Sequence, residues 1–281
     1  MNRKLLAVVV AALALGAAPA TASAWASAGE ATIHPGVQTN TDGSGQCTAN
    51  FIYQGGGDTY IGQAAHCAGT GAATDTNGCD AGTQPLGTQV QVDGAQFPGT
   101  IAYSSWIAMQ SKGETDPDAC AFNDLALVRL NPADVANVNP SVPGFGGPTG
   151  VGGVEGTGEM VYSYGNSSLR GGVTLLSPKQ GVLIQNEGNG WSHTVLTVTP
   201  GIPGDSGSGF LNGSGQAIGS LSTLQLAPLV GGNGVSDIAK EIAYMQANSS
   251  LSGVNLVPGT EAFNGNLVGA ILSQGPVALG G

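Results

Sequence analysis

One serine of this 281-residue chain stands in a setting that suits a nucleophile. Residues 201–209 read Gly-Ile-Pro-Gly-Asp-Ser-Gly-Ser-Gly, so Ser206 follows an aspartate and is flanked by glycines. A serine hydroxyl is a weak nucleophile at neutral pH and needs a neighbouring base and donors for the developing negative charge. Gly204 permits a sharp turn that would aim its own N–H and that of Ser206 at one point. Because 48 residues are glycine, a Gly/Ser loop also arises without function, and the assignment depends on a matching base and acid.

The search for the base is short because the chain has only three histidines. Histidine is the side chain whose ordinary pKa suits proton transfer near neutrality. His66 lies in Ala-Ala-His-Cys, at the end of a strand-like run and directly before a cysteine. His34 lies in an irregular segment beside Pro35, and His193 lies near a tryptophan, so we interpret both as ordinary surface or packed histidines. His66 is the candidate base.

The acid that orients such a base must be a carboxylate close to the core. Asp124 directly precedes the nearly continuous apolar run 125–130. An aspartate at that position needs hydrogen-bond partners, because a buried unpaired charge is costly. The alternative is a turn residue after Asn123, and Asp124 by itself does not decide between them.

The order His66, Asp124, Ser206 separates the possible hydrolase classes. An α/β-hydrolase places its serine before its histidine, but no histidine follows Ser206. A subtilisin-type order requires an aspartate motif before His66, and Asp42 and Asp58 lack that context. The windows Ala-Ala-His-Cys, Asn-Asp-Leu-Ala-Leu and Gly-Asp-Ser-Gly, in this order, resemble secreted actinobacterial proteases of the trypsin/chymotrypsin-like serine family. The strand pattern is compatible with that resemblance over about residues 45–250.

The resemblance implies a role for each site residue. Ser206 would attack the scissile carbonyl, His66 would take its proton, and Asp124 would orient His66. The backbone N–H groups of Gly204 and Ser206 would form the oxyanion hole. Ser222 would support the triad aspartate and begin the substrate-binding strand.

Two positions differ from the pattern of the family. The resemblance places substrate-pocket residues at Pro200 and Gly201, and Pro200 stands where members that prefer Lys or Arg carry an aspartate. We therefore predict no preference for a basic P1 residue (the residue before the cleaved bond), and favour an apolar or small one. Many members also pair the aspartate before the serine with a new Ile-Val-Gly-Gly-type amino terminus, which the sequence lacks. Asp205 then needs another partner, and Arg170 is our hypothesis.

The four cysteines indicate two disulfides in an exported chain, and the sequence permits three pairings. No two form a C-x-x-C motif, so zinc and thioredoxin-type redox sites are disfavoured. The resemblance implies Cys47–Cys67 beside the histidine and leaves Cys79–Cys120. We expect no cofactor and no metal. Glu114, Asp116 and Asp118 form an acidic cluster, which we interpret as a solvated loop in preference to a calcium site because the spacing does not fit an EF-hand.

Short runs with a period near two, broken by Gly, Pro, Asn and Asp, predict an all-β fold. The resemblance makes this two antiparallel six-stranded Greek-key barrels of the chymotrypsin type with a short C-terminal helix. We divide the chain into a signal peptide (1–24), an irregular N-terminal arm (25–45), an N-terminal barrel (46–138), and a C-terminal barrel with its tail (139–281). The strand-like runs are 48–53, 59–65, 88–92, 100–103, 125–130, 160–164, 173–176, 182–184, 194–199, 209–211 and 217–223. A serine cap and an apolar stripe at Ile238, Ile242 and Met245 predict one helix near 236–248.

The first 24 residues have a basic head, a short apolar run and small-x-small sites, which is typical of a secretory signal peptide. Of the seven Lys and Arg residues, Arg3 and Lys4 lie in this segment, which leaves five against 18 Asp and Glu. So few basic residues disfavour nucleic acid and anionic membranes as partners. We expect a secreted, monomeric serine endopeptidase that acts on peptides or proteins. The alternatives are a catalytically silent binding or structural protein of the same fold, and an esterase using the same triad.

Overall fold

The computed structural model describes residues 25–224 and 231–274, so the predicted signal peptide lies outside the described residues. The strands are β1 (Gln38–Thr41), β2 (Gln46–Thr48), β3 (Ile52–Gly55), β4 (Asp58–Ala64), β5 (Gln89–Val92), β6 (Gly99–Ser104), β7 (Leu125–Arg129), β8 (Met160–Tyr164), β9 (Pro178–Glu187), β10 (Ser192–Thr197), β11 (Gly209–Leu211), β12 (Ala217–Leu224), β13 (Gly232–Asp237) and β14 (Asn255–Leu256). The α-helices are α1 (Ser105–Lys112), α2 (Pro117–Phe122), α3 (Ile238–Asn248) and α4 (Leu267–Leu272). Short 3-10 turns include η1 (Ala65–Ala68), η3 (Ser168–Arg170) and η4 (Thr174–Leu176).

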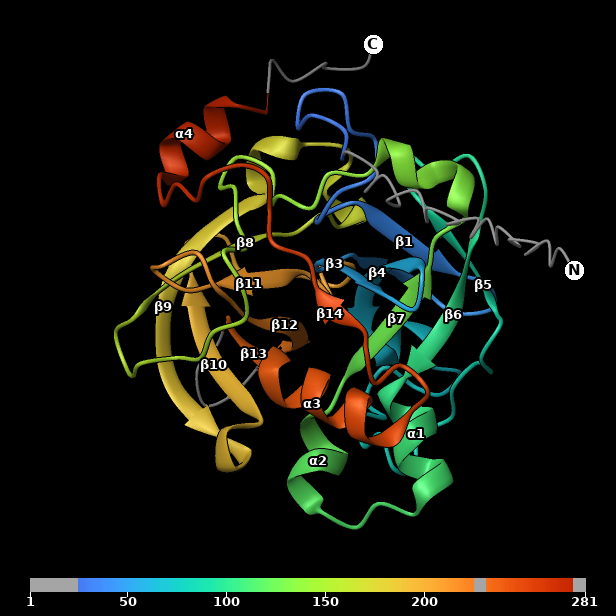
Figure 1. Ribbon diagram of the computed structural model, residues 1–281. Helices are drawn as coiled ribbons and strands as arrows, with labels where there is room; N and C mark the ends of the chain where they lie inside the picture. The colour runs from blue at the N-terminus through green and yellow to red at the C-terminus, as the bar shows by residue number, and fades with distance from the viewer. Residues whose placement is uncertain (1–24, 225–230, 275–281) are drawn as a thin grey trace, which may run out of the picture.

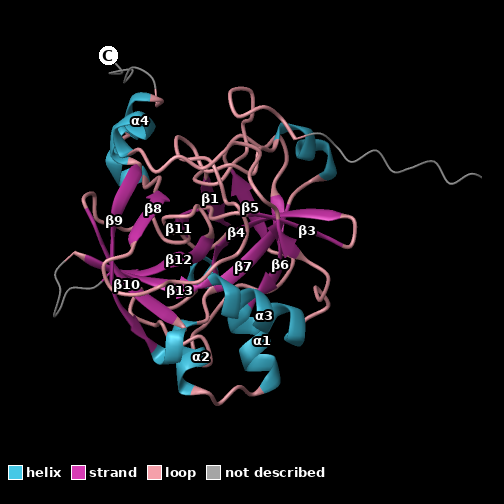
Figure 2. Cartoon of the chain, turned by 60° about the vertical axis from the view of Figure 1, so that its left-hand side comes forward, coloured by secondary structure: helices cyan, strands magenta, loops and turns pink. Residues whose placement is uncertain are grey.

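Two β structures lie side by side (Figure 1). The first is an antiparallel eight-stranded sheet in the order β14-β3-β4-β7-β6-β5-β1-β2, and the second is a closed six-stranded barrel, β10-β13-β12-β11-β8-β9. Both views place α1, α2 and α3 together at one end of the molecule (Figures 1 and 2). The all-β class and the six-stranded C-terminal barrel are confirmed.

The first half is a sheet of eight strands, two more than the six predicted for it. Residues 38–41, which we assigned to the irregular arm, form β1, which pairs with β5 and links β2 to the sheet. At the opposite edge β14 returns from the C-terminal region and pairs with β3. The backbone N–H of Thr48 on β2 donates to the carbonyl of Ser206 at 2.8 Å. The edge of β2 is therefore bonded to the serine loop of the second half.

Other differences concern short elements. The predicted strand at 173–176 is η4, and α1 and α2 occupy residues for which we expected no helix. The predicted C-terminal helix is present as α3, and Ile238, Ile242 and Met245 are buried on it. Its cap is Asp237, not Ser236: the Asp237 side chain accepts from the Lys240 N–H at 2.8 Å. Ser236 instead belongs to β13, whose residues sequence analysis did not recognise as a strand.

Apolar clusters fill each half, and one of them also joins the two halves. One fills the first sheet, around Ile61, Ile101 and Val128, and another fills the barrel, around Leu183 and Phe210. The third joins side chains of both halves, namely Phe51, Tyr53, Leu125, Leu127, Phe145, Tyr162, Leu211, Ile238, Ile242 and Met245. Because Leu125 and Leu127 belong to this third cluster, the residue that precedes β7 is fixed against the second half.

Among the described residues no helix combines the length and the apolar character needed to cross a membrane.

Candidate active site

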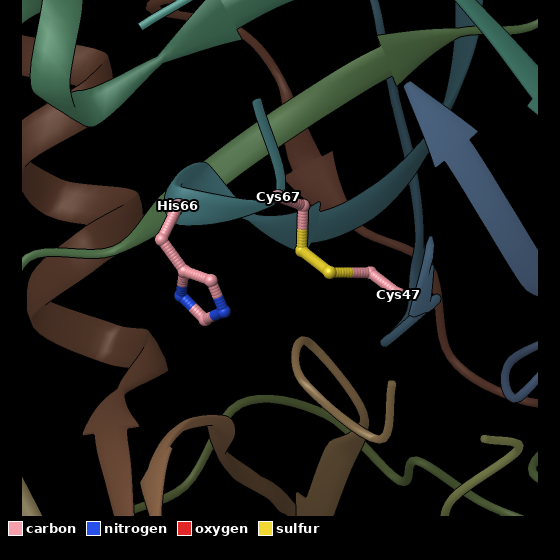
Figure 3. Close-up of side chains that lie close together, drawn as sticks. All are labelled: Cys47, His66 and Cys67. Carbon is pink, nitrogen blue, oxygen red and sulfur yellow. A yellow bond between two sulfur atoms is a disulfide. The ribbon is translucent and has the colours of Figure 1, made fainter. Parts of the chain in front are cut away.

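His66 is positioned by the short turn η1 at the end of β4. The N–H of Ala65 donates to the carbonyl of Asp124 at 2.7 Å, and the N–H of His66 donates to Asp124 Oδ1 at 2.8 Å. The next residue, Cys67, is joined to Cys47 of β2 by a disulfide, and the imidazole lies beside that bond (Figure 3). The backbone of His66 is thus fixed on both sides while its ring remains about a quarter exposed.

Asp124 holds the imidazole. His66 Nδ1 lies 2.7 Å from Asp124 Oδ2, and the Ser222 hydroxyl donates to the same oxygen at 2.6 Å. Asp124 is only 4% exposed. Burial by itself lowers the pKa of His66, but the charge and hydrogen bond of the Asp124 carboxylate outweigh it, so the pKa of His66 lies above its usual 6.5. This arrangement favours the tautomer with Nδ1 protonated and leaves Nε2 to act as a base.

The turn that carries Ser206 has two positions whose backbone conformation favours glycine. Gly204 and Gly207 have φ values of +95° and +86°, in the region that disfavours other residues. The Gly204 carbonyl accepts from Thr48 Oγ1 at 2.8 Å and from Gln46 Nε2 at 2.9 Å. Neither the Gly204 nor the Ser206 backbone N–H donates to another described residue. Two backbone donors are therefore available beside the Ser206 side chain.

Asp205 is held by two cations. The guanidinium of Arg170 binds both carboxylate oxygens, with Nη2 to Oδ2 at 2.6 Å, as hypothesised from the sequence. Lys179 Nζ lies 3.1 Å from Oδ2, and the N–H groups of Ser167 and Ile202 also donate to the carboxylate, at 3.0 and 3.1 Å. Asp205 is fully buried, and burial raises the pKa of its carboxyl. The hydrogen bond and charge of Arg170, together with Lys179, outweigh burial and hold that pKa below its usual value.

Lys179 was not identified from the sequence. It lies on β9 with a side chain that is 0% exposed, and burial lowers its pKa to about 8 in spite of Asp205. Its ammonium also donates to the carbonyls of Thr199 and Pro200 at 3.2 and 3.3 Å. A lysine in a β-strand carries no sequence signal for this role.

Glu241 on α3 is a second residue that sequence analysis missed. Its Oε1 accepts from the Asp124 backbone N–H at 2.8 Å, and the side chain is completely buried. Burial, together with the charge of the nearby Asp124, raises the pKa of Glu241 well above its usual value, which favours the neutral acid. Only the fold brings α3, 117 residues away in sequence, behind the candidate acid.

One cavity of about 830 Å³ joins most of the predicted site residues. His66, Ser206, Gly204, Gly201 and Ser222 all line it. The other histidines lie elsewhere: His193 is buried between Asp237 and Asn186, and His34 bonds the carbonyl of Pro35. Pro200 does not line the cavity, and its carbonyl faces Lys179.

Two groups of the described residues bear on whether the chain has a metal site. The ligand atoms of Cys47, His66 and Cys67 lie within 4.8 Å of one another, but the two sulfurs are bonded to each other and supply no thiolate. In the acidic cluster, Asp116 caps α2 through the Asp118 N–H, and Glu114 accepts from Thr115, Asp116 and Tyr244. These carboxylates thus have protein partners. The second expected disulfide, Cys79–Cys120, is also present.

Comparisons with known proteins place this geometry in context. No protein-family model matches the sequence. No curated protein matches it either. Among solved structures, Thermobifida fusca protease A is 21% identical over 82% of this chain and 100% of its own, with a TM-score of 0.52. Cellulomonas bogoriensis chymotrypsin and Nocardiopsis protease are 19% and 20% identical over 80% of this chain and 98% of theirs, each with a TM-score of 0.47. The chain has the fold of the Thermobifida protease, as the resemblance implied.

Proposed function

We propose that this protein is a serine endopeptidase that cleaves peptide bonds through Ser206, His66 and Asp124. The observation that carries the proposal is the contact of 2.7 Å between His66 Nδ1 and a buried Asp124 carboxylate, on a cavity that Ser206 also lines. The fold shared with the Thermobifida protease supports it.

The mechanism follows from these contacts. Ser206 Oγ attacks the carbonyl carbon while His66 Nε2 takes its proton, and Asp124 stabilises the resulting imidazolium. The N–H groups of Gly204 and Ser206 bind the oxyanion of the tetrahedral intermediate, where one donor contributes about 3–4 kcal/mol in related enzymes. The imidazolium then protonates the leaving amine. Water attacks the acyl-enzyme with His66 as base, which releases the acid and restores Ser206.

The oxyanion loop is the point at which a catalytically silent protein would differ. A buried Asp205 without a partner would disturb the turn, since an unpaired buried charge is costly. Arg170 and Lys179 supply the charge that a new amino terminus would otherwise provide. This pairing supports an enzyme that needs no cleavage to order its loop.

Secretion and substrate range belong to the same proposal. The leader-like residues 1–24 and the two disulfides support an exported protein that works outside the cell. The proposal takes it to act as a monomer on peptides or proteins. Asp75 is the only carboxylate among the described residues that line the cavity, and it belongs to a turn of the first half, where it accepts from the Ala72 N–H. The described lining thus offers no acid at Gly201 to bind a basic P1 side chain.

The test is hydrolysis of an unfolded protein substrate by the purified protein, compared with Ser206→Ala and His66→Ala. We expect each variant to lose about four orders of magnitude in kcat or more. Cleavage of the amide as well as the ester of the same peptide sequence distinguishes a peptidase from an enzyme restricted to esters. Retention of peptide cleavage by Ser206→Ala would exclude the proposal, as would a folded wild type that cleaves nothing.

A further inference from the structure

The cavity contains a buried amide that the proposed reaction does not use. Asn233 on β13 lines the cavity and is only 1% exposed. Its Oδ1 accepts from the Gly201 N–H at 2.9 Å. Because that N–H can only donate, the contact fixes which side of the amide is oxygen. The Nδ2 group is then the free end, and it has no hydrogen-bond partner.

This amide lines the same cavity as Ser206 and packs against residues next to the serine loop. A Cβ built on Gly201 would stand 2.9 Å from Asn233 Nδ2 and 2.8 Å from Leu221 Cδ2, so these three residues pack together. Leu221 also flanks the serine loop: its carbonyl accepts from the Gly207 N–H at 2.7 Å, and its N–H donates to Ser208. The group Gly201, Ile202, Leu221, Thr223 and Asn233, all of which line the cavity, is called the Asn233 pocket.

The Asn233 pocket offers both kinds of hydrogen-bonding group. Thr223 on β12 lies opposite Gly234 of β13, which is the neighbour of Asn233. The Thr223 hydroxyl lies against Gly234, since a Cβ built there would collide with it. That hydroxyl makes no hydrogen bond to a described residue, so it can accept as well as donate. Leu221 and Ile202 supply apolar surface around these two polar groups.

We propose that the Asn233 pocket selects a P1 side chain that ends in a neutral carboxamide, glutamine above all. The inference rests on the proposed function and names the substrate class of that same site. The P1 carbonyl oxygen accepts from Asn233 Nδ2, and the P1 amide N–H donates to the Thr223 hydroxyl. The methylenes of glutamine pack against Leu221 and Ile202.

Charge distinguishes glutamine from its acidic and basic competitors. No Lys or Arg lines the cavity in the described part of the chain, so a P1 glutamate would be buried without a counter-charge. A P1 lysine would meet the donor Nδ2 and no carboxylate. An apolar P1 side chain of the same length, methionine, fits the space but leaves the Nδ2 donor unpaired. Loss of such a bond lowers kcat/KM by about 10- to 100-fold.

The test compares fluorogenic peptides that differ only at P1: glutamine, methionine, glutamate and lysine. We expect kcat/KM for glutamine to exceed that for methionine by about 10-fold or more. In Asn233→Asp, an oxygen still accepts from Gly201 while the free donor becomes a carboxylate oxygen. This variant should lose the preference for glutamine and cleave the lysine peptide better than wild type does.

Labelling of Ser206 by a fluorophosphonate separates the two proposals. Wild type that does not label contradicts the proposed function itself. Wild type that labels but cleaves after methionine or glutamate as well as after glutamine overturns only the inference about the Asn233 pocket. An Asn233→Asp variant that labels like wild type and keeps an unchanged P1 profile also overturns it.

Discussion

Replacement of Arg170 by methionine tests how the serine loop is held. The variant removes two charged hydrogen bonds from Asp205, a carboxylate that is 0% exposed. Removal of one partner from a buried ion pair costs about 3–5 kcal/mol, because the remaining charge is left buried. Lys179 stays 3.1 Å from the same carboxylate, so we expect a loss near the lower end, about 3 kcal/mol. Cleavage activity should fall with it, since Asp205 directly precedes Ser206.

Arg129→Met is the matched control, because it makes the same substitution at an exposed pair. Arg129 lies 3.7 Å from Asp58, and the two side chains are 52% and 39% exposed. Such pairs contribute about 0–1 kcal/mol. The assay is urea unfolding near pH 7, with an unchanged m-value required for the comparison. If Arg170→Met costs no more than Arg129→Met, the reasoning about the buried Asp205 is wrong.

The dependence of folding stability on pH gives this prediction a second readout. The pKa of Asp205 is lowered in the folded protein, so its ion pairs stabilise the fold above the ordinary carboxyl pKa of 3.8. That stabilisation is lost as the pH falls through the lowered pKa. The difference in stability between wild type and Arg170→Met should therefore shrink in acid below about pH 4. A difference that stays constant to pH 2 would mean that Asp205 is not its source.

Three further predictions concern the triad and its support. The pKa of His66 is raised, and the base must be neutral to act, so kcat/KM should rise with pH with a midpoint above 6.5. A midpoint below 6.5 would contradict the Asp124 contact. Ser222→Ala removes the hydroxyl that donates to Asp124 at 2.6 Å, so kcat/KM should fall by about tenfold or more while the urea midpoint changes little. Unchanged kinetics would show that Ser222 does not support Asp124. Because the raised pKa of Glu241 favours its neutral form, Glu241→Gln, which keeps an acceptor for the Asp124 N–H, should unfold within about 1 kcal/mol of wild type. Glu241→Leu should lose about 1–3 kcal/mol, and equal losses in the two variants would contradict a role for Glu241 as the acceptor of that N–H.

The site could be predicted from the sequence where local motifs carry it. Ser206, His66 and Asp124 each stand in a short window of recognisable chemistry, and Arg170 follows from asking which cation could neutralise Asp205. Lys179, Glu241 and Asn233 could not be predicted. Each is an isolated polar residue in a strand or helix, and only the tertiary fold buries it beside its partner.

The fold shows the same limit. The run 125–130 is apolar enough to identify β7, and the spacing of Ile238, Ile242 and Met245 identifies α3. Strand β14 has two residues and pairs with β3 some 200 positions earlier, so no local sequence pattern predicts it. The eight-strand order of the first sheet depends on such long-range pairs, so local patterns did not predict the two strands beyond the expected six.

Covalent modification tests most directly whether Ser206 is the nucleophile. The purified folded protein is treated with a fluorophosphonate, digested, and mapped by mass spectrometry. We predict one adduct, on Ser206, which forms faster as the pH rises past the raised pKa of His66. The adduct should be absent in Ser206→Ala and in His66→Ala. A folded protein that stays unlabelled, or an adduct on another serine, would contradict this prediction.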